Sequence, residues 1–269
     1  LAVVGILVWA LINMYYSSQN IYSYRDPGVY GITAAWVQRN DTLNIPRSDV
    51  YGDQIEDSKI NLKTSSAGFG GSLVEKDTLY AQGQHLFPSL LGVAGRFIGD
   101  NWMYRLNAVF GGIALLSVYA VARLFVKPRW AFVSIIIFGA TLPLIYFSRD
   151  TYSEPLAAAI TFGALALLWA AERSKDLKIW LISGITAGGI VLSRVDGYLT
   201  IAAIVLYFII RLGTVDAKDR LNKTKCVLTY GVGVLSVGLL GYFDLTRLSS
   251  GYYVGLNHKV QHEIFIIFL

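Results

Sequence analysis

Apolar runs close to membrane-spanning length recur along nearly the whole sequence. They cover residues 1–16, 106–126, 130–147, 156–171, 179–192, 198–212 and 226–243. A transmembrane helix needs about 20 mostly apolar residues, and in lipid only helices and closed barrels satisfy the backbone hydrogen bonds. Charged residues make up only 15% of the chain, against about 25% in soluble domains. The sequence therefore predicts an all-α polytopic membrane protein.

The same runs predict four parts in the chain. Residues 1–16 form a truncated first transmembrane helix, and residues 17–101 form a loop that is too long for a simple connector. Residues 102–263 hold transmembrane helices two to seven with their connections. Residues 264–269 begin an eighth helix, in a chain that looks cut at both ends.

The long loop is itself predicted to contain two short helices. Val29, Ile32, Trp36 and Val37 recur at helical spacing, which predicts a helix over residues 28–39 that lies along the membrane surface. Residues 89–98 are apolar but too short to span, so they are predicted to form a second surface or re-entrant helix. The polar segment of residues 47–77 between them is predicted to be an extended loop.

The positions of Lys and Arg predict which side each connection faces. These residues are concentrated between the second and third, the fourth and fifth, and the sixth and seventh runs. The positive-inside rule places those three connections in the cytoplasm. The long loop and the turns around Arg149, Arg194 and Arg247 then face outward, and we expect a plasma-membrane location. Since the net charge of +5 is spread over helix ends, no nucleic-acid partner is expected.

Ionisable residues gather at the predicted outward ends of these helices. They are Arg25, Asp26, His85, Arg149, Asp150, Glu154, Arg194 and Asp196. Such groups near membrane depth cost a few kcal/mol each by insertion scales, so they usually serve a function. We expect them to form one polar cavity on the extracytoplasmic side. No Gly-rich phosphate loop stands between a strand and a helix in this sequence, so no nucleotide cofactor is expected.

This arrangement resembles the GT-C superfamily of integral-membrane glycosyltransferases. It is most similar to the dolichyl-phosphate-mannose protein mannosyltransferases and the bacterial aminoarabinose transferases. The segments that carry the resemblance are Arg25-Asp26-Pro27-Gly28-Val29-Tyr30, Gln84-His85-Leu86-Phe87-Pro88, Tyr146-Phe147-Ser148-Arg149-Asp150 with Glu154, and Leu192-Ser193-Arg194-Val195-Asp196-Gly197. The resemblance spans nearly all the chain and implies a GT-C-like helix bundle with a long first extracytoplasmic loop that carries surface helices.

The resemblance also implies an activity. A sugar would move from a polyprenyl-phosphate-linked donor in the membrane to an acceptor hydroxyl on the extracytoplasmic face, with inversion at the anomeric carbon. The acceptor would be a glycan, a lipid or a protein. Asp26 is expected to act as the general base. Arg194, Arg149 and Arg25 are expected to bind the donor phosphate, because a guanidinium suits bidentate phosphate contacts.

The remaining site residues concern a metal ion. Glu154, Asp150 and His85 are expected to bind the substrate or a divalent metal cation, which would share the stabilisation of the leaving phosphate. Many relatives carry two adjacent acids at the first site, whereas here Arg25 precedes a single Asp26. This departure leaves the metal requirement open.

Each assignment has a structural alternative. Asp26 and Glu154 also stand at predicted helix starts, where acids stabilise the helix end. Arg149 with Asp150, and Arg194 with Asp196, would also serve as interfacial ion pairs. His85 would equally serve as a packed polar residue. At the level of function, the alternatives are a secondary transporter, which would carry its ionisable groups near the midplane, and a non-catalytic lipid-binding subunit.

Overall fold

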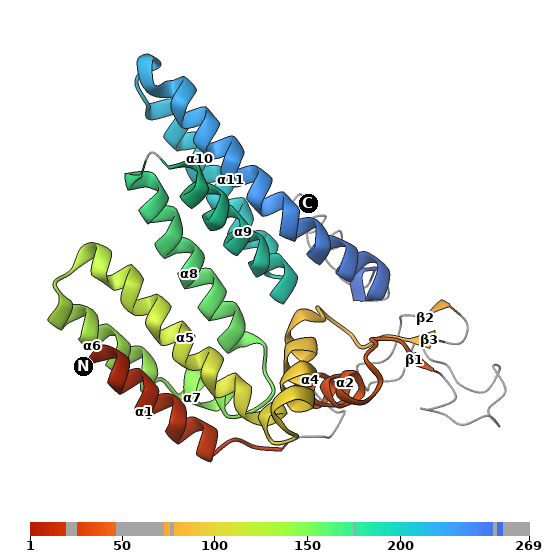
Figure 1. Cartoon of the computed structure of the whole chain (residues 1–269). Helices are drawn as coiled ribbons and strands as arrows, with labels where there is room; N and C mark the ends of the chain where they lie inside the picture. Colours follow the sequence, from red (N-terminus) through yellow and green to blue (C-terminus); the bar gives the residue numbers. More distant parts are fainter. Residues whose placement is uncertain (20–25, 47–72, 76–77, 175, 250–251, 255–269) are drawn as a thin grey trace, which may run out of the picture. The chain divides into compact units, whose positions relative to one another are not determined.

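The computed structural model describes residues 1–19, 26–46, 73–75, 78–174, 176–249 and 252–254, and helices dominate these residues, as predicted (Figure 1). The chain divides into two compact units, residues 1–18 with 104–242 and residues 19–103 with 243–269. Arg25 and the expected eighth helix lie outside the described residues.

The first unit is a bundle of eight helices among the described residues. They are α1 (Ala2–Tyr15), α5 (Trp102–Phe125), α6 (Pro128–Gly139), α7 (Leu142–Ser148), α8 (Glu154–Arg173), α9 (Leu177–Ser193), α10 (Gly197–Thr214) and α11 (Ala217–Phe243). Ile6, Leu115, Ile135 and Leu144 form one buried cluster, which joins α1, α5, α6 and α7. A second cluster around Trp180 joins α8, α9, α10 and α11. Apolar burial therefore holds each half of this bundle together.

Four of the described helices are long and apolar enough to cross a membrane, namely α5, α8, α10 and α11 together with the turn that follows it. The pair α6 and α7 forms a fifth candidate span, bent by 67°. The sequence predicted one helix there, over residues 130–147, and the structure corrects this. Pro143 lacks a backbone N–H and its ring clashes with the carbonyl four residues earlier, which belongs to Gly139, where α6 ends. The shorter helices α1 and α9 lie where spans were predicted.

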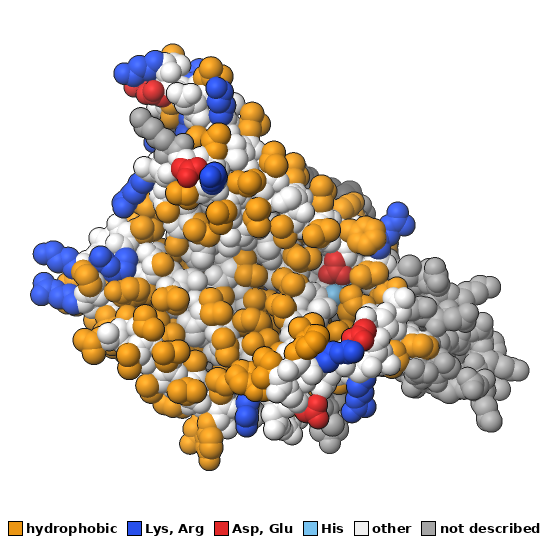
Figure 2. All heavy atoms as spheres, viewed as in Figure 1, with side chains coloured by type: hydrophobic (Ala, Val, Ile, Leu, Met, Phe, Trp, Pro, Cys, Tyr) orange, Lys and Arg blue, Asp and Glu red, His pale blue; other side chains and the backbone are white. Residues whose placement is uncertain are grey.

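Hydrophobic side chains are spread widely over the face of the bundle that Figure 2 shows. Leu206 and Ile209 on α10 and Leu228 on α11 are each more than half exposed, although such side chains would be buried in a soluble protein. Continuous exposed apolar surface of this kind is typical of contact with lipid. The protein is an integral membrane protein.

Glycines bring α9 and α11 into close contact. A Cβ atom on Gly184 would lie 2.1 Å from the Tyr230 carbonyl oxygen, and one on Gly188 would lie 2.6 Å from that of Val234. The contact is mutual, because a Cβ atom on Gly233 of α11 would lie 2.5 Å from the Leu181 carbonyl oxygen of α9. Small residues four apart allow this kind of backbone approach between membrane helices.

We expect Gly184→Val to destabilise the bundle by about 1–3 kcal/mol or more, because overpacking against a backbone atom forces the helices apart. Thermal unfolding in detergent, followed by tryptophan fluorescence, measures the effect. Gly231→Val is the matched control on α11, since a Cβ atom there meets nothing within 4 Å. Equal melting temperatures for the two variants would contradict this account of the helix contact.

The second unit contains the two helices predicted in the long loop, α2 (Asp26–Asn40) and α4 (Leu86–Ile98). The apolar stripe on α2 packs against protein. Val29 is buried with Ile45 and Ala81, and a Cβ atom on Gly92 of α4 would lie 2.7 Å from the Ala34 carbonyl oxygen of α2. Part of the stripe therefore packs within the unit, and the position of this helix at the membrane surface stays a prediction.

A small sheet also forms in this unit, and one of its strands lies within residues 47–77, where an extended loop was predicted. Its strands are β1 (Ile45–Pro46), β2 (Leu73–Glu75) and β3 (Thr78–Leu79). They are antiparallel in the order β1-β3-β2, with Ile45 opposite Leu79. The pairing of β1 with β3 brings the chain after residue 79 back to α2. Ala81 is therefore buried in the same cluster as Val29.

Candidate functional site

Arg194 forms the centre of a charged cluster in the first unit. It caps the C-terminal end of α9, and α8 packs beside this helix. Its Nη1 donates to Glu154 Oε1 at 2.6 Å and to the Ser153 hydroxyl at 3.1 Å, and its Nε donates to Asp196 Oδ1 at 3.0 Å. Desolvation alone would lower the pKa of Arg194, but the hydrogen bond to Asp196 and the charge of Glu154 outweigh it and raise the pKa. An arginine side chain stays protonated in proteins, so the guanidinium is a cation here.

The cluster leaves one buried acceptor open. Glu154 Oε1 accepts from Arg194, whereas Glu154 Oε2 is buried and has no hydrogen-bond partner in the described part of the chain. Leaving a buried acceptor unpaired is costly, about 1–3 kcal/mol. A substrate hydroxyl would satisfy this oxygen.

Arg149 lies in a different environment in the same unit. It follows α7, and its Nε donates to Asn13 Oδ1 of α1 at 2.8 Å. The guanidinium lies over the Tyr16 ring, 5.1 Å from its centre. Its two terminal nitrogens have no hydrogen-bond partner among the described residues, so they are available to an anion.

This arginine lines a mainly apolar groove. A cavity of about 360 Å³ lies between α1, α5 and α6, and its lining includes Trp9, Phe132 and Ile136 with Asn13 and Arg149. Trp9 Nε1 donates to the Gly139 carbonyl oxygen at 2.8 Å, which fixes the indole in the groove wall. A mainly apolar groove with one guanidinium in its wall is suited to a lipid chain with an anionic head.

The turn that carries Arg149 and Asp150 is fixed by a buried asparagine on α5. Asn107 is fully buried, and its Nδ2 lies 2.7, 2.6 and 2.8 Å from the carbonyl oxygens of Phe147, Asp150 and Tyr152. Asp150 Oδ1 accepts from the Thr151 backbone N–H at 2.7 Å. Both residues therefore shape the turn, and sequence reasoning did not identify Asn107.

Asp26 is the first residue of α2 and is exposed. This position suits a catalytic base, since a reacting hydroxyl can approach the carboxylate. It equally suits an acid that stabilises the helix start. Arg25, its predicted neighbour in the site, lies outside the described residues.

His85 is buried and bound to protein through both ring nitrogens. Its Nδ1 lies 2.7 Å from Asp244 Oδ1, and its Nε2 lies 3.0 Å from the Ala81 carbonyl oxygen. Neither nitrogen is free to bind a metal ion in this arrangement, which agrees with the alternative of a packed polar residue.

The predicted metal ligands do not gather into a metal site in this structure. Among the described residues, no group of three or more His, Cys, Asp or Glu side chains is placed to hold a metal ion. Arg194 already lies between Glu154 and Asp196, which disfavours a second cation there. These donors do not fit a divalent cation, so no step proposed below passes through one.

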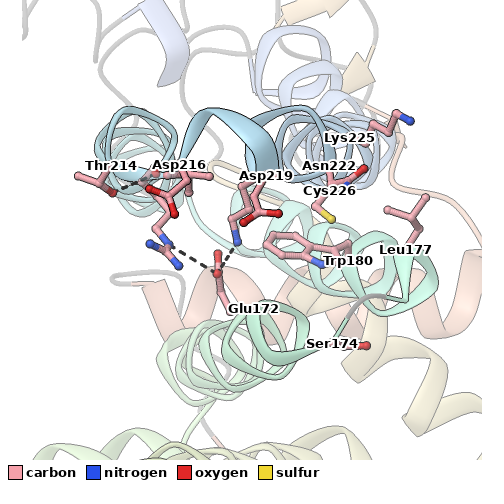
Figure 3. Close-up of a pocket in the computed structure, with 13 residues that line it drawn as sticks. Glu172, Ser174, Leu177, Trp180, Thr214, Asp216, Asp219, Asn222, Lys225 and Cys226 are labelled. Atoms are coloured by element: carbon pink, nitrogen blue, oxygen red, sulfur yellow. Dashed lines mark hydrogen bonds and ion pairs between the residues drawn. The ribbon is translucent and has the colours of Figure 1, made fainter.

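A larger cavity of about 730 Å³ lies at the opposite end of α8 (Figure 3). Glu172 there pairs with Lys223 and lies 3.8 Å from Arg211 Nε. Lys223 also lies over the Trp180 ring, 4.5 Å from its centre. Glu172 follows Glu154 by five turns of helix, about 27 Å, which separates this cavity from the Arg194 cluster. Its lining holds three acids (Glu172, Asp216 and Asp219) and three bases (Arg211, Lys223 and Lys225), so its charges balance and it does not favour a ligand of one sign.

Comparison with known proteins identifies the family. A family profile described as dolichyl-phosphate-mannose-protein mannosyltransferase matches residues 96–239, more than half of the chain. The chain belongs to this mannosyltransferase family. No curated protein and no solved structure gave a match.

Membership of the mannosyltransferase family confirms the resemblance to the GT-C superfamily, and the protein is a GT-C-type glycosyltransferase. The matched segment includes Arg149, Glu154 and Arg194 and ends before Asp244. It begins after Asp26 and His85. The roles of individual residues stay predictions.

The structure also adds polar residues that sequence reasoning did not select. Asn13, Asn107 and Asp244 are buried, and each contacts a predicted site residue or the turn that carries one. Each of the three stands within or at the end of an apolar run. A polar residue in such a run is costly unless it is paired. Its presence in an apolar run was therefore the sequence signal that could have identified each of the three.

Proposed function

We propose that this glycosyltransferase transfers a sugar from a polyprenyl-phosphate-linked donor to an acceptor hydroxyl on the extracytoplasmic face of the membrane. The observation that carries the proposal is the mainly apolar groove that Arg149 helps to line, within a chain of the mannosyltransferase family. In this proposal the groove would hold part of the lipid chain, and the two terminal nitrogens of Arg149 would bind its phosphate. The family description, which names dolichyl-phosphate-mannose, supports this class of donor.

The proposed reaction is a single displacement. The acceptor oxygen attacks the anomeric carbon while Asp26 takes the hydroxyl proton. The bond between the anomeric carbon and the phosphate oxygen breaks on the opposite face, so the configuration inverts. Polyprenyl phosphate leaves with the bonding electrons and an additional negative charge, which Arg149 stabilises through charge-assisted hydrogen bonds.

Arg194 has a different proposed role. Two carboxylates already bind it, so a phosphate would have to compete with Glu154 and Asp196. We propose that Arg194 mainly holds Glu154 in place, and that Glu154 Oε2 accepts a hydrogen bond from a sugar or acceptor hydroxyl. The extracytoplasmic location of the site is supported by the concentration of Lys and Arg in the connections at the other ends of the helices.

The donor class is tested with membranes that contain the protein and its native acceptors. Polyprenyl-phosphate-[³H]mannose is added to one sample and a nucleotide-linked mannose to another, after endogenous synthesis of the lipid donor is blocked. We expect label to enter glycan, lipid or protein only from the polyprenyl donor. Label that enters only from the nucleotide donor would contradict the proposal, and protein-dependent solute transport in proteoliposomes without sugar transfer would favour a transporter.

A further inference from the structure

A short π-helix, η2 (Asp244–Leu248), follows α11 and carries a buried acid that binds the long loop. Asp244 makes two contacts with His85, although the residues lie 159 positions apart. The His85 backbone N–H donates to Asp244 Oδ2 at 2.7 Å, and His85 Nδ1 lies 2.7 Å from Asp244 Oδ1. π-Helical turns are rare and often occur at functional sites.

Further bonds fix the loop segment that precedes His85. The His85 Nε2 proton is donated to the Ala81 carbonyl oxygen, since a carbonyl can only accept. Ser249, directly after η2, donates its hydroxyl hydrogen to the Gly83 carbonyl oxygen at 2.6 Å. Asp244 and Ser249 therefore hold the segment of residues 81–85 at two points, and both are buried.

The same segment contacts α2 one helical turn after Asp26. Gly83 has a positive φ of 95°, and a Cβ atom on it would lie 3.4 Å from the Tyr30 hydroxyl oxygen. Phe87, which is fully buried, packs edge-to-face on the Tyr30 ring with the ring centres 5.4 Å apart. Residues four apart lie on the same side of a helix, so these contacts reach the side of α2 that carries Asp26.

We propose that Asp244 is a positioning residue for the transfer reaction. Through His85 it fixes the segment of residues 81–87 against Tyr30, and this contact sets the orientation of the first turn of α2 and of Asp26. The inference rests on the proposed role of Asp26 as the base. It links η2 to the proposed base, and both lie within the second unit.

Two substitutions of Asp244 show whether its hydrogen bonds to His85 or its negative charge is required. In Asp244→Asn the side-chain oxygen still accepts from the His85 backbone N–H, and the amide N–H can donate to His85 Nδ1. In Asp244→Ala both bonds are lost. Arg247→Ala is the matched control, because Arg247 lies in the same π-helix and is exposed.

Transfer kinetics and amide hydrogen exchange are measured on the full chain for each variant. We expect Asp244→Ala to lower kcat about 10- to 100-fold with little change in donor KM, since a displacement of about 1 Å costs rates of this order. Asp244→Asn should restore kcat to within a few-fold, and Arg247→Ala should match wild type. Adding His85→Ala to Asp244→Ala should cost little more, because the two side chains act as one unit. Full kcat in Asp244→Ala, or equal losses in the Ala and Asn variants, would overturn the proposal.

Hydrogen exchange gives a readout that does not need activity. The amides of residues 83–88 should exchange faster in Asp244→Ala than in wild type or Asp244→Asn. If wild type shows no transfer from a lipid donor, the proposed function fails, and exchange alone still decides whether Asp244 holds this segment. Should Asp244→Ala not fold, Ser249→Ala removes the second bond and should give a smaller loss of the same kind. Unchanged exchange in the folded variant would refute the positioning role.

Discussion

Asp26→Asn is expected to reduce the rate of sugar transfer by about 10²- to 10⁴-fold, the usual contribution of a general base. Asparagine keeps the size of the side chain and loses the ability to take the acceptor proton. Donor affinity should stay close to wild type, because in the proposed reaction the carboxylate contacts the acceptor rather than the phosphate. Initial rates with polyprenyl-phosphate-mannose and a donor-binding titration measure the two quantities.

A helix-start role for Asp26 predicts a different pattern. Loss of an acid in the first turn of a helix costs about 0.3–1 kcal/mol of stability and would leave turnover nearly intact. Asp219→Asn is the matched control, because Asp219 is an exposed acid in the first turn of α11. If the two variants lose the same small amount of stability and both keep their activity, Asp26 is not the base.

Arg149→Gln is expected to lower kcat/KM about 10- to 100-fold. A charge-assisted hydrogen bond contributes about 1.5–3 kcal/mol, and each 1.4 kcal/mol is a factor of ten. Arg149→Lys should recover part of the loss, since a lysine keeps the charge but not the bidentate geometry. Binding of unglycosylated polyprenyl phosphate, measured by native mass spectrometry in nanodiscs, should weaken in parallel.

Two comparisons make the Arg149 prediction specific. Arg105→Gln removes an exposed arginine near the start of α5 and should change neither quantity. Arg194→Gln should affect kcat more than donor binding, because in the structure Arg194 contacts Glu154 and Asp196. If only Arg194→Gln weakens the binding of polyprenyl phosphate, the phosphate binds at Arg194 and not at Arg149.

The fold followed from the sequence because long apolar runs have few solutions in a membrane. The predicted runs among the described residues are helical, with a break only in residues 130–147, and α8 begins at Glu154 with Pro155 next, as expected from the sequence. The break at Pro143 was less clear, because a proline within a membrane helix can also be accommodated by its neighbours. The short strands around Ile45 and Leu79 pair across 34 positions, and two-residue strands leave no periodic pattern in a sequence.

The side-chain pairings of the candidate site were the least predictable part. The sequence suggested Arg149 with Asp150, two adjacent charges, whereas the structure joins Arg149 to Asn13, 136 positions away. It likewise joins His85 to Asp244. Such pairings depend on how helices pack, and a single sequence does not record packing. Arg194 with Asp196 was predictable, because both residues lie in one short turn.

The most direct test of the account is a cryo-EM map of the protein with a non-hydrolysable polyprenyl-phosphonate sugar. The account predicts the lipid chain in the groove of Trp9 and Phe132, and the phosphonate about 3 Å from the Arg149 guanidinium. The Asp26 carboxylate should then face the anomeric carbon from the side opposite the phosphonate. A phosphonate bound away from Arg149, or an Asp26 carboxylate that faces away from the bound sugar, would contradict the account.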